Sequence, residues 1–424
     1  MNGSGLWHAE QAWLGRSAQD VLIEVEDGRI KAVTEDVPAP AGAVHLGGWT
    51  IPGLANAHSH AFQRSMRGSV ESGGGDFWEW RQRMYQAAEV VEPGRFLNDA
   101  RKVFREMLNA GITAVGEFHY LHAFGNELGE ELIEAAGREG IRITLLDACY
   151  LRGGMDGRPL EGAQRSFSDG DADRWAQRMD SLEAAWLEPR TLAGRDGTEG
   201  VRIGAAIHSV RAVDPASMRT VAAWARKRNA PLHIHLAEQP AEVEECLAVE
   251  GCTPSQLLER EGILGPDLTA VHAIHLDARD ISLLADNKVS ICVCTTTERD
   301  LGDRVGPLRA LSDAGSALCA GSDSNSVIDI LEEARGLELD QRRTTGRRVL
   351  HQPEELFRAA TVDGMRALGW EAGELKPGKL ADFITVHPPE SGEWLGMGLD
   401  YLIFACSARD VTNVVVGGTT VVSR

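Results

Sequence analysis

Apolar and polar positions follow a pattern along this chain that changes twice. Residues 1–48 contain short strand-like segments, "DVLIEVEDGRIKAV" and "AVHLGGW", joined by turn-forming residues. From residue 49, short apolar segments alternate with amphipathic stretches of helical periodicity. After residue 376 the segments "LADFITVHP" and "VTNVVVGGTTVVSR" return to β character. The pattern therefore predicts one α/β region enclosed between two β-forming terminal segments.

The apolar segments in the middle of the chain are predicted to be the strands of a parallel barrel. They read "WTIPGLANAH", "ITAVGEFHY", "IRITLLDACY", "VRIGAAIHS", "PLHIHLAE", "LTAVHAIHL", "KVSICVCTTT" and "SALCAGSDS". Helices are expected between them at 94–110, 126–139, 215–228, 278–286 and 328–345, and "SGGGD" at 72–76 predicts a flexible loop. This alternation predicts an α/β fold, a (β/α)8 TIM barrel over residues 49–375. Residues 1–48 and 376–424 are expected to form a small β-sandwich domain together.

Histidines gather at the ends of these predicted strands. His58 and His60 close the first segment, and residues two apart in a strand point to the same face. The fifth segment carries His235, the sixth His272, and Asp323 follows the eighth. Because the carboxyl ends of barrel strands meet at one face, these side chains are expected to converge there. Such a cluster of imidazoles and a carboxylate predicts a metal site.

The expected metal ligands are His58, His60, His235 and Asp323. Three nitrogens and one carboxylate suit Zn²⁺, and Fe²⁺ is the alternative. A barrel that holds two metals needs a bridging anion, commonly a modified lysine of the fourth strand. The fourth segment and its exit, "VRIGAAIHSVRAVD", contain no lysine. The sequence therefore predicts one Zn²⁺ per chain.

Charge and composition limit the classes of partner. The formal net charge of −20 repels nucleic acid and anionic membranes over most of the surface. The sequence contains no apolar run of membrane-spanning length, and its first residues do not have the pattern of a secretory signal. Its seven cysteines are scattered without a C-x-x-C pair, which is typical of reduced cytoplasmic proteins. We expect a cytoplasmic protein that acts on a small molecule.

The segments "PGLANAHSHAFQR", "HIHLAEQ", "VHAIHL" and "GSDSN" resemble the amidohydrolase superfamily in its mononuclear deaminase branch. The longer segments "HSHAFQRSMRG", "FWEWRQRMY", "AGITAVGEFHYLH" and "GAAIHSVRAV" are similar to those of formimidoylglutamate deiminases of histidine degradation. This resemblance extends through nearly the whole chain. It implies zinc-dependent hydrolysis of N-formimino-L-glutamate to N-formyl-L-glutamate and ammonia, and relatives suggest a homodimer.

Three residues are expected to carry the proton transfers. Glu238 lies three positions beyond His235 and would deliver a proton to the departing ammonia if the strand has ended and turned by then. His272 would polarise or deprotonate the attacking water. Asp323 can also accept a proton, so the general base is either His272 or Asp323. His233 is expected to support a ligand or to pack in the core, and His275 to be structural or to face solvent, whereas His119 and His122 either line the pocket or cap it.

A substrate with two carboxylates needs arginines, because guanidinium groups bind carboxylates in a bidentate manner. Arg211, just after the fourth strand, and Arg81, in the long first loop, are expected to bind this dianionic substrate. The resemblance implies further polar contacts from Gln63, Tyr120 and His208.

Three other functions remain as alternatives. A deaminase of the same branch that acts on guanine, cytosine or a triazine would recognise a neutral ring through amide and aromatic contacts rather than arginines. A non-catalytic scaffold on the same barrel would lack metal ligands, and all the expected ligands are present here. A two-metal amidase would need the lysine that the fourth strand lacks.

Overall fold

The structure is a computed structural model that describes residues 3–68, 77–187, 200–387 and 398–424. The loop expected at 72–76 lies outside the described residues. In the described part of the chain, no helix is both long and apolar enough to cross a membrane. All seven cysteines lie in that part, and each is a free thiol.

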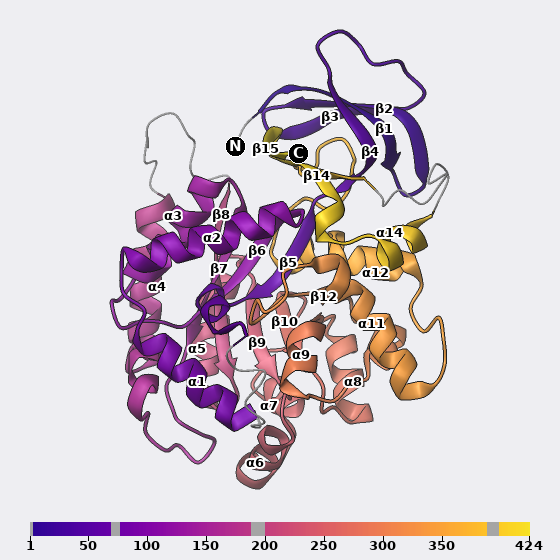
Figure 1. The fold of residues 1–424 in the computed structure, drawn as a ribbon. Coiled ribbons are helices and arrows are strands. Elements are labelled where there is room, and N and C mark those ends of the chain that lie inside the picture. Colours follow the sequence, from indigo (N-terminus) through magenta and orange to yellow (C-terminus); the bar gives the residue numbers. More distant parts are fainter. Residues whose placement is uncertain (1–2, 69–76, 188–199, 388–397) are drawn as a thin grey trace.

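A parallel barrel forms the larger part of the molecule, as the sequence predicts (Figure 1). Its strands pair in chain order from β5 to β12, and each neighbouring pair is parallel. Every residue of β6 and β7 is buried, as expected for parallel strands covered by helices. The strands are β5 (Leu54–Ser59), β6 (Ile112–His119), β7 (Arg142–Cys149), β8 (Val201–Ser209), β9 (Leu232–Leu236), β10 (Leu268–His272), β11 (Ser290–Val293) and β12 (Leu318–Ala320).

Backbone hydrogen bonds between the segment after β12 and the end of β5 close the barrel. Asp323 N–H donates to the His58 carbonyl at 2.9 Å, and His60 N–H donates to the Asp323 carbonyl at 2.9 Å. Gly321 permits this close approach, because a Cβ there would lie 2.8 Å from the Cβ of His58. The closure brings the first and last strands of the barrel together at its carboxyl end.

Helices surround the barrel, and the five helices expected from periodicity are α2, α3, α5, α8 and α11, with ends within two residues of the prediction. The Asp214 side chain caps α5 by accepting the Ser217 N–H at 3.1 Å. The α-helices are α1 (Phe77–Glu89), α2 (Arg95–Asn109), α3 (Glu127–Glu139), α4 (Ala172–Leu187), α5 (Pro215–Lys227), α6 (Pro240–Glu250), α7 (Pro254–Arg260), α8 (Ala278–Asp286), α9 (Thr295–Leu301), α10 (Leu308–Ala314), α11 (Ile330–Thr345), α12 (Pro353–Ala360), α13 (Val362–Ala367) and α14 (Leu399–Ala405). Shorter 3₁₀ helices are η1 (Ala61–Met66), η2 (Gly162–Phe167) and η3 (Ala408–Asp410).

The terminal segments of the chain combine into a separate mixed sheet, as expected (Figure 1). This sheet is continuous, with the strand order β15-β14-β13-β4-β1-β2-β3. Strand β4 of this sheet extends on both sides of residue 48, where a domain boundary is expected. The exact position of that boundary stays a prediction. The strands are β1 (Gly5–Trp13), β2 (Ser17–Glu26), β3 (Arg29–Thr34), β4 (Val44–Pro52), β13 (Phe383–Val386), β14 (Val411–Val416) and β15 (Thr419–Ser423).

A buried ion pair joins the terminal sheet to the barrel. Arg142, the first residue of β7, donates to both carboxylate oxygens of Asp382 at 2.6 and 2.9 Å. Asp382 also accepts the Gly417 N–H at 2.7 Å. Since both charged side chains are at most 1% exposed, loss of either one would leave an uncompensated buried charge. This ion pair therefore holds the terminal sheet against the barrel.

Candidate metal centre and active site

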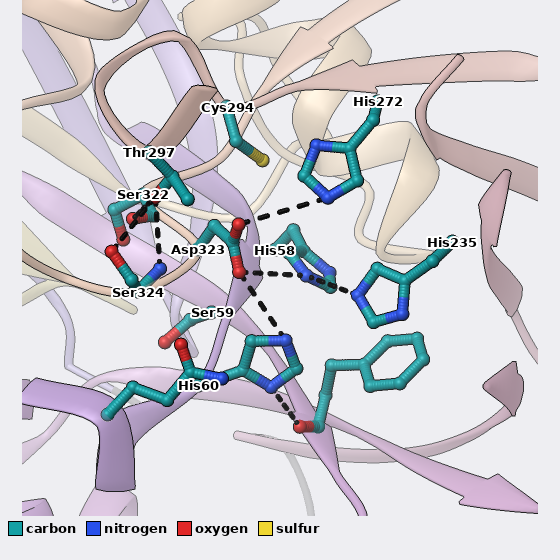
Figure 2. A network of polar contacts seen from close by, with 12 residues as sticks. His58, Ser59, His60, His235, His272, Cys294, Thr297, Ser322, Asp323 and Ser324 are labelled. Atoms are coloured by element: carbon teal, nitrogen blue, oxygen red, sulfur yellow. Dashed lines mark hydrogen bonds and ion pairs between the residues drawn. The ribbon is translucent and has the colours of Figure 1, made fainter. Parts of the chain in front are cut away.

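The four expected metal ligands meet at the carboxyl end of the barrel (Figure 2). The Nε2 atoms of His58 and His235 lie 3.1 Å apart. Asp323 Oδ1 lies 3.5 Å from His58 Nε2 and 3.4 Å from His60 Nε2. Four ligands placed about 2.0–2.1 Å from a tetrahedral Zn²⁺ are separated from one another by about 3.3 Å. The spacing of these donor atoms therefore fits a tetrahedral cation.

The protonation of the histidines also fits a cation. His60 Nδ1 lies 2.8 Å from the Phe118 carbonyl, and His235 Nδ1 lies 2.9 Å from the His208 carbonyl. Because a carbonyl only accepts, each Nδ1 carries a proton and each Nε2 presents a lone pair to the centre. Burial lowers the pKa of His58 to about 3, and it also lowers the pKa of His60 and His235. Neutral imidazoles of this kind are the form that binds a metal.

Left-handed backbone occurs at or directly beside three residues that line the pocket, Glu238, His272 and Asp323. Ala237, His272 and Asp323 have φ angles of 50°, 70° and 45°, in the left-handed region that non-glycine residues rarely adopt. Each of these residues lies where a barrel strand ends or just beyond that end. A left-handed backbone conformation at a non-glycine residue costs free energy, which the surrounding structure must offset. Such conformations cluster at functional sites, where the surrounding structure holds the chain in a specific geometry.

Glu238 faces the pocket because β9 ends at Leu236 and the chain turns at Ala237, as the sequence analysis requires. Its Oε1 lies 3.7 Å from His272 Nε2, and the same nitrogen lies 3.9 Å from Asp323 Oδ2. Burial raises the pKa of Glu238 to about 7. Burial also opposes the charged form of His272, but the carboxylates around it outweigh this effect and raise its pKa to about 10. Two groups able to exchange protons thus face the expected metal ligands.

Glu298, on α9, is a residue that the sequence analysis missed. It is buried, and its Oε1 lies 3.2 Å from His272 Nδ1 and accepts the Cys294 N–H at 3.1 Å. In sequence it resembles an ordinary first-turn acid of a helix, "TTTERDL". Only its contact with Nδ1 of His272, the ring nitrogen directed away from the pocket, distinguishes Glu298 from such a helix-terminal acid.

All five residues expected to bind substrate line one pocket above this centre, together with His60, His235, Glu238, His272 and Asp323. Gln63 donates to the Tyr120 hydroxyl at 3.1 Å. The five are Gln63, Arg81, Tyr120, His208 and Arg211, and the pocket walls that the sequence analysis did not assign are Trp80, Met84, Tyr85, Tyr150 and Phe167.

Arg211 is held in place by a carboxylate that the sequence analysis also missed. Its Nε donates to Glu242 Oε2 at 3.0 Å, and Glu238 Oε2 lies 3.9 Å from its Nη2. Glu242 is fully buried and also accepts the Ala237 N–H at 2.9 Å. The same carboxylate therefore fixes both the arginine and the turn that carries Glu238.

His119 and His122 lie in a second buried cluster with Asp147. The guanidinium of Arg178 occupies this cluster, since its Nη2 lies 2.7 Å from Asp147 Oδ1 and 3.2 Å from His122 Nε2. A metal cation bound at this second cluster would be repelled by the positive charge of Arg178. His122 N–H donates to the Ser166 carbonyl at 2.8 Å, so the cluster holds η2 beside the pocket. His233 contacts the Ala367 carbonyl at 3.2 Å inside the barrel, as a packed residue would.

The fold and this donor set define the class of protein. Residues 49–421 match the model of the amidohydrolase family, and the chain belongs to that family. Its homologues are hydrolases acting on carbon–nitrogen bonds, and so is this chain.

Among its relatives is the formimidoylglutamate deiminase of Pseudomonas aeruginosa, which is 35% identical over 98% of this chain and 94% of its own. The 5-methylthioadenosine/S-adenosylhomocysteine deaminase of Natronomonas pharaonis is 26% identical over 95% of this chain and 88% of its own. Among solved structures, an amidohydrolase from Brucella melitensis superposes with a TM-score of 0.90 at 32% identity, covering 99% of this chain and 95% of its own. The chain is therefore similar to deaminases with different substrates.

Proposed function

We propose that this enzyme hydrolyses N-formimino-L-glutamate to N-formyl-L-glutamate and ammonia with one Zn²⁺ per chain, in histidine degradation. The proposal is supported by the 35% identity to a formimidoylglutamate deiminase across nearly the full length of both chains. The observation that carries it is the presence of Arg81 and Arg211 in the same pocket as the metal ligands. Two guanidinium groups match a substrate with two carboxylates, which a protein of net charge −20 would otherwise repel.

The chain's own residues divide the reaction between them. Zn²⁺ held by His58, His60, His235 and Asp323 would supply Lewis-acid activation of a water molecule. Water adds to the formimino carbon, and the water proton passes to the pair of His272 and Asp323. Glu238 donates a proton to the departing nitrogen and takes up the remaining proton of the added oxygen, which stays on the carbon as the formyl group. The proton held by His272 and Asp323 also passes to the nitrogen, so both water protons leave with ammonia. The proximity of Glu238, His272 and Asp323 within one buried pocket supports this assignment.

Arg211, Arg81, Gln63, Tyr120 and His208 orient the substrate in this proposal. Arg211 is 11% exposed at its side chain and lies beside Glu238, so a carboxylate bound to it would lie close to the proton donor. Binding energy from the carboxylates would thus be used to position the formimino carbon.

A deaminase of purine-like rings is the competing function, since relatives at 26–28% identity are deaminases of 5-methylthioadenosine. The experiment is ammonia release by zinc-loaded protein from N-formimino-L-glutamate, N-formimino-L-aspartate, guanine and 5-methylthioadenosine. Rapid turnover of the formimino acids with little on either ring supports the proposal. Turnover of a ring alone overturns the substrate while retaining the deaminase chemistry.

We also propose that the enzyme is a cytoplasmic homodimer that binds neither nucleic acid nor membranes. The high negative charge and the unpaired cysteines support the location and the absence of these partners. Light scattering on the purified enzyme tests the dimer, and a monomeric mass would contradict it.

A further inference from the structure

A hydrogen-bonded group of three residues forms part of the pocket wall and is not used by the chemistry described so far. The Gln164 amide nitrogen donates to the hydroxyls of Tyr85 and Tyr150, each at 3.0 Å. Gln164 Oε1 accepts the Glu161 N–H at 3.2 Å, which fixes the orientation of the amide because a backbone N–H can only donate. Both amide hydrogens of Gln164 are therefore committed to the two tyrosines.

The hydroxyl of Tyr85 has no remaining lone pair. It accepts one hydrogen from Gln164 and another from Arg81 Nε. A hydroxyl offers one proton and two lone pairs, so Tyr85 can act only as a donor to any further group.

Tyr150 keeps its own proton uncommitted. Its hydroxyl accepts from Gln164, and among the described residues none accepts the Tyr150 proton. Tyr150 follows β7, is 4% exposed, and lines the pocket beside Arg211 and His208. Its ring lies edge-on to that of His208, with centroids 4.4 Å apart, which restricts its orientation. The network thus holds the Tyr150 O–H at a fixed place in the pocket wall.

We propose that Tyr150 is a substrate-binding residue whose hydroxyl donates to a carboxylate oxygen of the substrate. Gln164 is a positioning residue, because its amide donates to this hydroxyl and leaves the hydroxyl proton for the ligand. Tyr85 accepts the other amide hydrogen and so helps to position Gln164. A buried donor of this kind matches a carboxylate better than a ring amino group, which is itself a donor. This inference rests on the proposed function, since it assumes an anionic acyclic substrate.

The test compares wild-type enzyme with Tyr150→Phe, Gln164→Met and the double variant, using N-formimino-L-glutamate turnover and calorimetric binding of N-formyl-L-glutamate. Loss of a hydrogen bond to a charged group predicts a KM about tenfold higher for Tyr150→Phe, with kcat changed much less. Gln164→Met keeps the hydroxyl but releases its orientation, so we expect a smaller rise in KM. The double variant should be no worse than Tyr150→Phe alone, because both changes remove the same contact.

Tyr401→Phe, in α14 outside the pocket, is the matched control and should leave KM unchanged. Unchanged KM and unchanged product binding in Tyr150→Phe would overturn the inference while the proposed function stands. Additive losses in the double variant would also overturn it, since they indicate general loss of structure. A wild-type enzyme that neither turns over N-formimino-L-glutamate nor binds its product overturns both proposals.

Discussion

The carboxylate of Glu298 lies 3.2 Å from Nδ1 of His272, on the side of the ring opposite the nitrogen that faces Glu238 and Asp323. A carboxylate accepts the Nδ1 proton, so this contact orients the ring and sets which nitrogen faces the pocket. Glu298 itself is held by the N–H of Cys294 at 3.1 Å. A residue of α9 therefore controls a side chain at the end of β10.

Two substitutions of Glu298 distinguish the effect of its charge from its role as a hydrogen-bond acceptor. Glu298→Met leaves the His272 proton and the Cys294 N–H unpaired, and we expect kcat to fall about tenfold to 100-fold, since orientation of a general acid or base is lost. Glu298→Gln keeps an acceptor oxygen and should retain most of the activity. Steady-state kinetics and metal content check this, and equal losses in both variants would show that charge rather than orientation matters.

Glu238→Gln should retain one zinc per chain but lose turnover by about 100-fold or more, because the amide cannot donate the proton that ammonia requires. Ammonia release and metal analysis of the same preparation measure the two effects. Glu244→Gln, an exposed acid of α6 in the same segment, is the matched control and should behave as wild type. Activity of Glu238→Gln within a few-fold of wild type would remove Glu238 from the proton transfer.

Arg211→Ala is expected to lower kcat/KM by about 100-fold or more, which corresponds to about 3 kcal/mol, with the zinc content unchanged. The same change leaves the fully buried Glu242 without its cation, so the free energy of unfolding should also fall. Arg211→Ala/Glu242→Gln removes that buried charge and should recover stability without recovering kcat/KM. Recovery of both would mean that Arg211 acts on folding rather than on substrate.

Zinc titration of the chelated protein should saturate at one tight equivalent per chain, and ammonia release should return with it. His235→Ala should lose most of this binding, because it removes one of four converging donors. His233→Ala is the matched control, since His233 contacts the Ala367 carbonyl inside the barrel. Two tight equivalents per chain would contradict a single-metal centre.

Glu333 on α11 predicts a pH dependence of stability. Burial raises its pKa from the usual 4.5 to about 8, although Thr295 and Thr296 donate to it. The folded protein thus keeps a proton that the unfolded chain releases, and this contribution to stability is lost as the pH rises from about 4.5 to 8. Glu333→Gln lacks the effect, so its stability relative to wild type should increase across this range.

Denaturant unfolding of both proteins at several pH values between 5 and 9 measures the difference. Glu354→Gln, an exposed acid of α12, should follow the wild-type curve. Parallel curves for Glu333→Gln and wild type would contradict a raised pKa at Glu333.

Local patterns predicted the barrel because its strands and helices depend on short-range periodicity. The eight apolar segments became β5 to β12, and the histidine and aspartate positions at their ends became a single cluster. His58 and His235 are 177 residues apart, yet their meeting followed from one rule, that parallel barrel strands share a carboxyl face. For the same reason the turn that aims Glu238 at the pocket could be expected from the spacing alone.

The sequence by itself thus determined the fold class and the positions of the proposed metal donors and of the proposed proton carrier, since strand order and side-chain alternation specify them. Only the tertiary structure revealed Glu298, Glu242 and the group of Tyr85, Tyr150 and Gln164. These residues lie on helices and connecting loops, where no periodicity indicates which atoms will meet. Their roles arise from hydrogen bonds between distant segments, and such contacts exist only once the helices are packed around the barrel.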